Sequence, residues 1–578
     1  MQSCKISGAE ALIKSILEEN VKTVFGYPGG TIIPLYNVLY DYKDKLRHIL
    51  VRHEQGAVHA AEGFARATGQ VGVCMATSGP GATNFVTGIA DAMMDSTPIV
   101  CITAQVNVCN MGTNFFQEAD MIGITSPITK WNYQIIKASE IATIIPQAFY
   151  IAKSGRPGPV LISVTKNAQI EMTDFVYDRQ AALDKMVRVV RPDKTKENES
   201  RIAEAIELLN NAKKPLIIAG QGVIISGAEQ ILAKCASKGQ IPVACTLLGR
   251  SAMNFHDRYY IGMVGMHGNI SANNMTQQSD VIMAVGMRFS DRVTGNTKGF
   301  APNAKIIHID IDKTEFNKNI IVDVKLHGDA KVMLEKICEG LESRDREEWR
   351  QFGYKKYDYE KEVVIDPKLN SPVLNMAQVI DAINSHYVEP MCETQENYGK
   401  DVVLITDVGQ NQMFAARYLN LTMKTGWVTS GGLGTMGFAL PAGIGAKCGR
   451  PEAEVIVITG DGGLQMNIQE LGTILQNKIN VKIVLLNNSF LGMVRQWQDL
   501  FYEKRFAHTQ LVNPDFSLIC KAYDIQYRKV EKPEDLKSAI EEMAASKRAF
   551  FLEAVVDAEA NVFPMIPGGE SLDDIRIH

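Results

Sequence analysis

Two apolar runs in the last third of the chain, each followed at once by polar residues, constrain the fold most strongly. Residues 454–459 run into Gly460-Asp461-Gly462-Gly463, and residues 481–486 run into Asn487-Asn488. Short runs without polar residues on either face are typical of strands buried inside a parallel sheet. The carboxyl ends of such strands form the edge where open α/β sheets bind ligands. The pattern therefore predicts an acid and an amide close together at one sheet edge.

The chemistry of this pair favours a hard cation. The Asp461 carboxylate and an asparagine carboxamide supply only oxygen ligands, which suit a Mg²⁺ ion that completes its shell with water and substrate phosphates. A lone Gly-Asp-Gly is about equally typical of a plain strand-to-helix turn. The second half at Asn487-Asn488 favours the metal interpretation, and the arrangement resembles the metal–diphosphate signature of thiamine diphosphate (ThDP) enzymes.

The length of 578 residues predicts three to four domains at about 150 residues each. Strand-like and helical stretches alternate, which is typical of α/β domains with doubly wound parallel sheets. Polar, charged stretches separate three such units. We expect domains over 1–190, 191–345 and 375–560, a linker over 346–374, and a C-terminal tail over 561–578 near the active site. Within the second linker, residues 347–350 are expected to form a solvated helix.

Composition excludes several classes of protein. The formal net charge is −5 and no basic block is present, which argues against binding nucleic acid or an anionic membrane surface. No apolar run approaches the roughly 18 residues of a membrane span. The first residues lack a signal-peptide pattern, so we expect a cytoplasmic protein. The ten cysteines form no C-x-x-C pair and are expected to be reduced thiols.

Glu54 is a candidate acid–base residue. It lies at a predicted strand-to-helix junction, Arg52-His53-Glu54-Gln55-Gly56, among small apolar residues. Such a carboxyl could exchange a proton with a ligand. The alternative is a first-turn glutamate that interacts favourably with the helix dipole. A zinc motif is excluded, because Ala57 interrupts any H-E-x-x-H pattern.

Four further segments could bind ligands, and each has a structural alternative. Residues 78–84 form a Gly-rich turn before a helix, which can bind anions or simply pack tightly. Gly220-Gln221-Gly222 follows a strand, but Ile225 replaces the third glycine of a dinucleotide fingerprint. Residues 286–292 contain two arginines that could recognise a carboxylate or form surface ion pairs. Residues 430–437 combine glycines with a methionine that could support a flat ligand or fill a core.

These elements occur together, in one order, along nearly the whole chain. In chain order the motifs are Tyr27-Pro28-Gly29-Gly30, Arg52-His53-Glu54-Gln55, Thr77-Ser78-Gly79-Pro80-Gly81, Phe116-Gln117-Glu118, 154–159, Gly265-Met266-His267-Gly268, 292–295, 430–434, 491–494, Gln496-Trp497 and 564–567. Each motif alone is weak, but the combination is specific. Together they resemble the catalytic subunits of acetohydroxyacid synthase (acetolactate synthase).

The resemblance implies a fold and an activity. The fold would comprise a pyrimidine-binding domain, a central FAD-binding domain and a diphosphate-binding domain. The enzyme would decarboxylate pyruvate on ThDP and transfer the hydroxyethyl carbanion to a second 2-keto acid. Pyruvate as acceptor gives 2-acetolactate, and 2-ketobutyrate gives 2-aceto-2-hydroxybutyrate, in the first common step of valine, leucine and isoleucine biosynthesis. FAD would be mainly structural, because the net reaction transfers no electrons.

The resemblance also implies roles for individual residues. The metal ligands would be the side chains of Asp461 and Asn488 and the backbone carbonyl of Phe490. Met436 would bend the cofactor so that its two rings meet. The ThDP-binding residues would be Glu54, Pro80, Val408, Gly409, Gln410, Gly434, Met436, Gly460, Asp461, Gly462, Gly463 and Asn488.

The catalytic and substrate residues follow in the same way. Glu54, supplied by the partner subunit, would hydrogen-bond the pyrimidine ring, and Gly30, Gln117 and Lys166 would lie near the reacting carbon or its channel. The acceptor keto acid would be bound by Arg292 and Trp497, with Met493 and Val494. The FAD-binding residues would be Arg156, Gly220, Gly222, Thr246, Leu247, His267, Gly286, Arg288, Arg292, Asp310, Ile311 and Asp329.

The resemblance further implies a homodimer, or a dimer of dimers, and a small regulatory subunit. The chain departs from the usual pattern at Asn107, Thr165, Ser290 and Asn411, and Gly568 is a variable site; none of these positions removes a catalytic group. Alternative activities are a flavin-dependent pyruvate oxidase, a flavin-free catabolic acetolactate synthase, or a nicotinamide-dependent dehydrogenase. A non-catalytic scaffold is disfavoured because Glu54 is retained.

Overall fold

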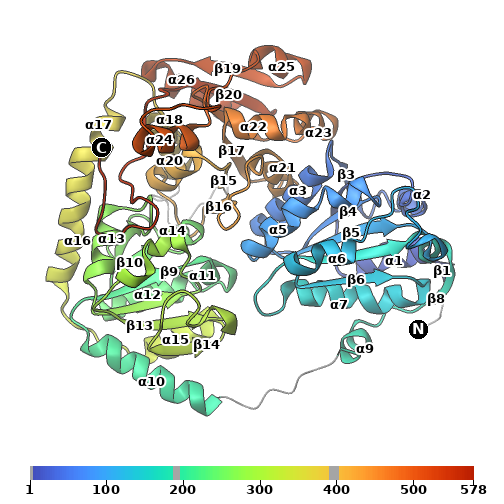
Figure 1. Cartoon of the computed structure of the whole chain (residues 1–578), viewed down its shortest axis with the longest axis horizontal. Helices are drawn as coiled ribbons and strands as arrows, with labels where there is room; N and C mark the ends of the chain where they lie inside the picture. The colour runs from blue at the N-terminus through green and yellow to red at the C-terminus, as the bar shows by residue number, and fades with distance from the viewer. Residues whose placement is uncertain (1–3, 187–194, 390–401) are drawn as a thin grey trace.

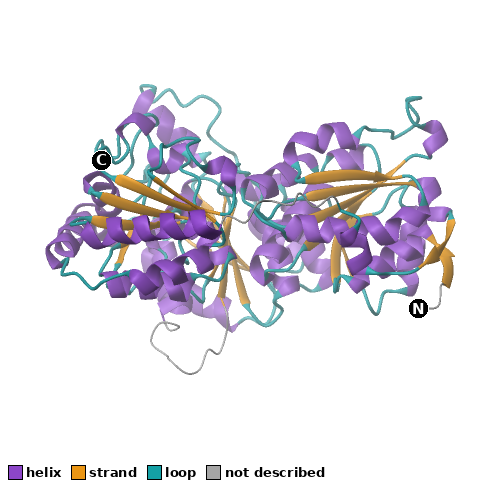
Figure 2. Ribbon diagram, turned by 90° about the horizontal axis from the view of Figure 1, so that it is seen from below, coloured by secondary structure: helices purple, strands orange, loops and turns teal. Residues whose placement is uncertain are grey.

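The computed structural model describes residues 4–186, 195–389 and 402–578. It contains three α/β domains, each built on a six-stranded parallel sheet with helices on both faces (Figures 1 and 2). The predicted fold class is therefore confirmed. The expected boundary at residues 190 and 191 lies outside the described residues. No helix in the described part of the chain is both long enough and apolar enough to cross a membrane.

The N-terminal domain has the strand order β3-β2-β4-β5-β7-β6, and a small antiparallel pair, β1 with β8, lies outside this sheet. Its strands are β1 (Cys4–Ser7), β2 (Thr23–Tyr27), β3 (Arg47–Leu50), β4 (Gly72–Ala76), β5 (Ile99–Gln105), β6 (Trp131–Ile135), β7 (Val160–Thr165) and β8 (Met172–Phe175). Its helices are α1 (Gly8–Glu18), α2 (Ile33–Asp41), α3 (Glu54–Thr68), α4 (Pro80–Thr83), α5 (Val86–Met94), α6 (Met121–Thr125), α7 (Ile141–Lys153), α8 (Lys166–Ile170) and α9 (Arg179–Asp184).

The central domain has the order β11-β10-β9-β12-β13-β14, which reverses direction between β9 and β12. Its strands are β9 (Pro215–Ala219), β10 (Val243–Cys245), β11 (Tyr260–Met263), β12 (Val281–Val285), β13 (Lys305–Asp310) and β14 (Val324–His327). Its helices are α10 (Thr195–Asn211), α11 (Gln221–Ile225), α12 (Glu229–Gly239), α13 (Ile270–Gln278), α14 (Asp291–Thr294) and α15 (Ala330–Gly340). Sheets of this kind bind ligands in the crevice at the reversal.

The C-terminal domain has the order β16-β15-β17-β18-β20-β19. Its strands are β15 (Val402–Thr406), β16 (Gly426–Thr429), β17 (Glu454–Gly460), β18 (Lys482–Asn487), β19 (Gln526–Val530) and β20 (Phe550–Val555). Its helices are α18 (Met376–Ile383), α20 (Gln410–Tyr418), α21 (Ala439–Gly449), α22 (Asp461–Met466), α23 (Leu471–Asn477), α24 (Gly492–Phe501), α25 (Phe516–Ala522) and α26 (Leu536–Ala545). Asp401, which precedes β15, lies outside the described residues.

The strand β17 shows why the apolar runs are uninterrupted. Val455 and Val457 pack into the hydrophobic core on one face of the sheet, while Ile456 and Ile458 pack into the core on the other face. Both faces of a central parallel strand are covered by helices, so every position must be apolar. Each of the three sheets likewise separates two hydrophobic cores.

The N-terminal and C-terminal domains pack through corresponding helices. Helix α3 follows the second strand of its sheet in chain order, and α21 follows the second strand of the other sheet; the two helices lie against each other (Figure 1). A Cβ on Gly63 would lie 2.0 Å from the Ala442 carbonyl oxygen, and one on Gly445 would lie 1.8 Å from the Ala60 carbonyl oxygen. Glycine is thus required at both positions for this close contact between helix backbones.

The stretch expected as a solvated linker is instead packed. Helix α16 (Glu347–Glu360) lies along the central domain, and α17 (Asp366–Leu369) leads into the C-terminal domain (Figure 1). Trp349 is buried and its Nε1 donates to the Pro215 carbonyl oxygen at 2.9 Å. A helix does form at residues 347–350, and Glu347 and Glu348 are exposed as expected. The expectation of full solvation was wrong, because Trp349 and Arg350 are buried and the indole anchors the helix. The C-terminal tail also packs on the central domain, where Ile566 and Leu572 join its core.

Candidate active site

The predicted metal half-site is assembled at the C-terminal ends of neighbouring strands. Strand β17 pairs with β18 in parallel, with Gly460 opposite Leu486, so Asp461 and Asn488 both emerge at the same edge. Both side chains are buried, and each carries a side-chain oxygen of the type that Mg²⁺ prefers. The third predicted ligand, the carbonyl of Phe490, lies two residues after Asn488. Burial raises the pKa of Asp461, against hydrogen bonds that lower it. A bound cation would favour the ionised form, so the residues present fit a Mg²⁺ ion.

A second group of candidate residues lies at the corresponding edge of the N-terminal sheet. Glu54 begins α3, and its Oε2 accepts a hydrogen bond from Asn84 Nδ2 at 2.9 Å. A Cβ on Gly81 would lie 3.1 Å from Glu54 Oε1, and one on Gly79 would lie 2.9 Å from Gln117. The turn after β4 thus brings Glu54 and Gln117 into one neighbourhood. Lys166 begins α8 directly after β7, in the same sheet.

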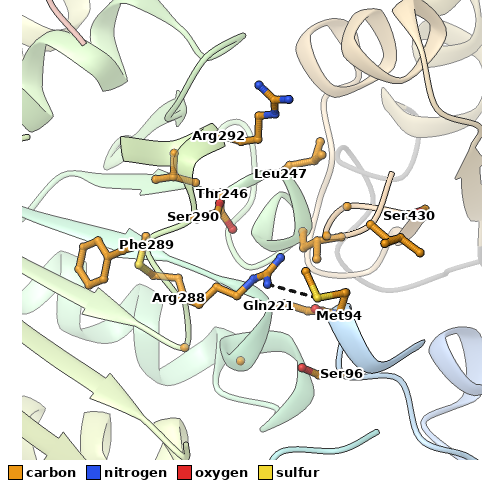
Figure 3. A pocket seen from close by; sticks show the side chains of 18 of the residues that line it. Met94, Ser96, Gln221, Thr246, Leu247, Arg288, Phe289, Ser290, Arg292 and Ser430 are labelled. Carbon is orange, nitrogen blue, oxygen red and sulfur yellow. Dashed lines mark hydrogen bonds between the residues drawn. The ribbon is translucent and has the colours of Figure 1, made fainter. Parts of the chain in front are cut away.

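A cavity of about 810 Å³ lies between the domains, opening from the strand-order reversal of the central sheet. Its walls come from all three domains. Arg288 extends from the central domain across the cavity toward Met94 of the N-terminal domain, with a 3.9 Å Nη1–Sδ contact (Figure 3). The C-terminal domain contributes Ser430 and the glycine-rich turn that follows it. This volume and mixed lining are typical of a cofactor site.

The residues predicted to bind FAD gather around this cavity. It is lined by Arg156, Gly222, Thr246, Leu247, His267, Gly286, Arg288, Arg292, Asp310, Ile311 and Asp329. Gly220 does not line the cavity. A Cβ there would lie 2.2 Å from the Gly286 carbonyl oxygen, so this glycine allows two neighbouring strand ends to pack.

His267 has a buried ring nitrogen that a bound ligand would satisfy. Its side chain is buried, and its Nδ1 has no hydrogen-bond partner in the described structure. Burial lowers the pKa of His267 to about 3, with further lowering by Arg417 and Arg292, so the ring is neutral near neutral pH. A buried polar atom without a partner is costly. A ligand in the cavity would satisfy it, and the lining therefore fits a large cofactor such as FAD.

The predicted ThDP and substrate residues divide between this cavity and the metal edge. Val408, Gly409, Gly434 and Met436 line the cavity, together with Arg292, Met493, Val494 and Trp497. A Cβ on Gly434 would meet only Val408 at 3.9 Å, so the glycine leaves space beside the cavity. The other predicted ThDP residues do not line the cavity and lie at or just after the carboxyl ends of β15, β17 and β18. They are Gln410, Gly460, Asp461, Gly462, Gly463 and Asn488.

The two halves of the predicted site are not brought together within one chain. Among the described residues, neither Glu54 nor Pro80, Gly30, Gln117 or Lys166 lines the cavity that contains Met436. The Glu54 junction instead contacts a different part of the C-terminal domain, because Glu470 Oε1 accepts hydrogen bonds from the backbone N–H groups of Arg52 and His53, each at 3.0 Å.

Reasoning from sequence missed the acids that position the glycine-rich turn. Asp95 accepts from Gly431 N at 2.8 Å and from Gly432 N at 2.6 Å, and Asp91 Oδ1 accepts from Ser430 Oγ at 2.5 Å. Asp91 lies on α5 of the N-terminal domain, and Asp95 is the residue that caps the C-terminal end of this helix. Their four-residue spacing on a helix was a signal that they share a face, but nothing in the sequence indicated what that face contacts.

Asp407 holds the other side of the same turn. Its carboxylate accepts from the backbone N–H groups of Val408 at 2.9 Å, Gly437 at 3.0 Å and Ala439 at 3.1 Å. It follows β15 directly, so its position at a strand end was a usable signal that sequence reasoning did not use. Together with Asp91 and Asp95 it fixes the backbone on both sides of Met436.

Three sequence-family models match the chain. They are the N-terminal TPP binding domain (residues 6–124), the central domain (202–337) and the C-terminal TPP binding domain (407–554) of thiamine pyrophosphate enzymes. Curated relatives match over almost the whole chain. The acetolactate synthase large subunit of Cyanidium caldarium is 41% identical over 98% of this chain and 96% of its own length.

Two bacterial acetolactate synthase subunits are also similar to the chain over almost its whole length. The acetolactate synthase large subunit of Corynebacterium glutamicum is 42% identical over 99% of this chain and 90% of its own length. The acetolactate synthase isozyme 2 large subunit of Escherichia coli K12 is 39% identical over 98% of both chains.

Proposed function

The chain belongs to the acetolactate synthase large subunits of the thiamine pyrophosphate enzyme family, and we propose that it condenses pyruvate with a second 2-keto acid. The products are 2-acetolactate from pyruvate and 2-aceto-2-hydroxybutyrate from 2-ketobutyrate. Thiamine diphosphate is the family cofactor, and when bound it supplies the carbanion chemistry that amino-acid side chains lack. The observation that carries the proposal is the match, over at least 98% of this chain, to acetolactate synthase large subunits at 39–42% identity.

The residues of the C-terminal edge would hold the cofactor diphosphate through a metal. Asp461, Asn488 and the Phe490 carbonyl offer three oxygens to Mg²⁺, and phosphate oxygens with water would complete the shell. The acids around residues 430–437 fix the backbone that carries Met436, so this apolar support is preorganised before the cofactor arrives.

Glu54 would act as the acid–base group on the cofactor's pyrimidine ring. Asn84 donates to Oε2 and thereby fixes the carboxylate, leaving Oε1 beside Gly81, where the missing side chain leaves room. General acid–base catalysis needs a carboxyl held in one orientation within hydrogen-bonding distance of its ligand.

Arg292 would recognise the carboxylate of the acceptor keto acid. Its side chain is 64% exposed at the cavity. Its Nη1 contacts Met266 Sδ at 3.5 Å and its Nε lies 3.9 Å from Asp291 Oδ2, beyond hydrogen-bonding distance, so the guanidinium remains accessible to a ligand. A guanidinium fork matches a carboxylate in a two-pronged geometry. Trp497 lines the same cavity and would shape the space for the acceptor's side chain.

FAD would occupy the central part of the cavity, where His267, Arg288 and the strand ends meet. The reaction itself is redox-neutral, so its role would be structural. A pyruvate oxidase would instead consume oxygen, and a flavin-free catabolic enzyme would purify colourless. A nicotinamide-dependent dehydrogenase is disfavoured, because the incomplete dinucleotide fingerprint falls in a domain that matches the thiamine pyrophosphate enzymes.

A homodimer would complete the site. Glu54 lies away from the cavity that contains Met436, so Glu54 of one copy would meet the C-terminal edge of the other. The relatives are named large subunits, and we therefore also propose a small regulatory subunit as a partner. The dimer rests on the division of the site between two sheet edges, and the small subunit rests on the names of the relatives.

Product analysis tests the proposed activity. The purified protein should convert pyruvate to acetolactate with ThDP and Mg²⁺, and should form acetohydroxybutyrate when 2-ketobutyrate is added. FAD loading is read from the flavin absorption spectrum. Oxygen uptake matched to pyruvate loss, with no acetolactate, would contradict the proposal.

Complementation tests the shared site. Mixed chains carrying Glu54→Gln or Asp461→Ala should recover about a quarter of wild-type activity, because about half of randomly paired dimers are mixed and each mixed dimer keeps one intact site. No recovery above the separate variants would place both residues in a single-chain site.

A further inference from the structure

We propose that Asn513 is a positioning residue for the metal site, and that residues 509–513 form a strap that determines how tightly the protein holds Mg²⁺. The strap lies between helices α24 and α25, outside the predicted ligand set. This inference rests on the proposed function, because it concerns the same metal half-site. It assigns a role to a segment and to a side chain that the sequence motifs do not include.

The side chain of Asn513 is fixed on three sides. Its Nδ2 donates to Asp461 Oδ2 at 2.7 Å and to Asn487 Oδ1 at 2.9 Å, while its Oδ1 accepts from Gln465 Nε2 at 2.9 Å. A carboxylate oxygen can only accept, so the amide of Asn513 must present its nitrogen to Asp461. One oxygen of the metal ligand is therefore held by a neutral donor that adds no charge to the site.

The strap also holds the loop that carries the other two ligands. Leu491 N donates to the Thr509 carbonyl at 2.8 Å, and Leu511 N donates to the Ser489 carbonyl at 2.8 Å. Ser489, between Asn488 and Phe490, has a φ of 57°, which non-glycine residues seldom adopt. Such a backbone persists only where its surroundings hold it. The two strap hydrogen bonds supply that support.

Asn487, the first residue of the Asn-Asn pair, extends the support away from the metal. Its Nδ2 donates to Glu553 Oε1 at 2.7 Å, and Glu553 in turn accepts from the Tyr527 hydroxyl. These contacts orient the side-chain amide of Asn487 so that its Oδ1 faces Asn513 Nδ2. The two asparagines thus have different roles: Asn488 would bind the metal, and Asn487 orients Asn513, which in turn orients Asp461.

The consequence is a preorganised ligand set. Groups that orient metal ligands are worth about 10–100-fold in metal affinity when they are removed. Loss of the Asn513 donor would let the Asp461 carboxylate rotate and would leave the buried Asn487 oxygen without that partner. The cost should fall on metal binding and not on the chemistry once the metal is bound.

The test is a Mg²⁺ titration of the metal-stripped full-length enzyme at fixed ThDP, followed by intrinsic tryptophan fluorescence. Asn513→Ala and Asn513→Leu should both raise the apparent Kd for Mg²⁺ by about 10–100-fold. Leucine keeps the branched arrangement of side-chain heavy atoms and fills the space, whereas alanine empties it, and both lack the donor. Agreement between the two variants therefore separates the loss of the donor from a change in packing. Gln510→Ala is the matched control, because Gln510 is exposed and pairs with Phe490 as a backbone bridge.

The outcomes are distinct. At saturating Mg²⁺ the Asn513 variants should regain kcat to within about twofold of wild type, and the melting temperature of the metal-free protein should be unchanged. The inference would be overturned if the Asn513 variants bound Mg²⁺ as tightly as Gln510→Ala does. It would also be overturned if the kcat of the Asn513 variants stayed low at saturating Mg²⁺. If the wild-type enzyme binds ThDP without any dependence on Mg²⁺, the metal assignment within the proposed function fails instead.

Discussion

The N-terminal and C-terminal domains share one sheet topology and differ in what they place at the same edge. When only the strands of each six-stranded sheet are numbered, in chain order, both sheets have the order second, first, third, fourth, sixth, fifth. In the N-terminal sheet, Glu54 follows the second strand and a Ser-Gly-Pro-Gly turn follows the third. In the C-terminal sheet, glycines follow the second strand, Asp461 follows the third and Asn488 follows the fourth.

The difference shows that the topology supplies a binding edge and the residues decide its chemistry. The N-terminal edge carries a carboxyl group, that of Glu54, beside small residues. The C-terminal edge carries the side-chain oxygens of Asp461 and Asn488, which we propose as ligands for a cation. Neither edge would bind and activate ThDP alone, so an enzyme of this family needs both. The following variants change one edge at a time.

The largest effect is expected at the N-terminal edge. Glu54→Gln keeps the shape of the side chain and removes the acid–base function, so kcat should fall by roughly 10²–10⁴-fold. ThDP and Mg²⁺ should still bind, because the C-terminal edge is intact. Steady-state kinetics and fluorescence titration measure the two quantities separately.

Asp44→Asn, an exposed acid of the same domain, serves as the control for general handling of the protein. Near-normal turnover of the Glu54→Gln enzyme would show that the N-terminal edge does not perform the acid–base step.

A somewhat smaller effect is expected at the C-terminal edge. Asp461→Ala removes a direct ligand, so Mg²⁺-dependent ThDP binding should weaken by about 10²-fold or more, beyond the usual cost of losing a supporting group. Activity should recover in part at high Mg²⁺ and ThDP. Unchanged cofactor affinity would refute the metal assignment.

Contacts between the two domains should matter less than either edge. Asp95→Asn weakens the hydrogen bonds that hold Gly431 and Gly432, and it should raise the apparent Kd for ThDP by about 10-fold, with little change in kcat at saturation. Thr87→Ala is the control, because Thr87 is exposed on the same helix α5. Equal ThDP affinities of the two variants would show that α5 does not preorganise the turn.

The smallest effect concerns a buried acid between the domains. Burial, followed by the nearby Asp95, raises the pKa of Glu62 well above its ordinary value, and its Oε2 has no partner among the described residues. The folded protein therefore retains a proton that the unfolded chain releases. The contribution of Glu62 to stability is largest below its unfolded pKa and falls as the pH rises above it.

Glu62→Gln removes this dependence, so the melting temperature of the variant should rise relative to wild type between about pH 5 and about pH 8. The difference has an upper limit of about 1.4 kcal/mol per pH unit for one group. Calorimetry of the holoenzyme measures it, and the exposed Glu204→Gln is the control. If the difference in melting temperature between Glu62→Gln and wild type became smaller as the pH rose, the raised pKa of Glu62 would be contradicted.

Much of the fold was predictable because central parallel strands and capped helices have strong local signals. Helix α3 begins at Glu54, at the predicted strand-to-helix junction, and the apolar runs 454–459 and 481–486 form strands β17 and β18. The sheet-edge strands β6 and β19 carry no such signal. Their residues are only partly buried, so they lack the continuous apolar pattern that identifies a central strand.

For the candidate site, too, one part was predictable from the sequence and another part was not. The sequence alone determined that Asp461 and Asn488 lie at neighbouring strand ends, because two apolar runs of a parallel sheet must end at one edge. Only the tertiary structure decided what surrounds them. The contact of Asp95 with Gly431 and that of Asp461 with Asn513 join segments without any local signal in common. Hydrogen bonds of this kind depend on how separate elements pack, and no periodicity along the chain encodes that packing.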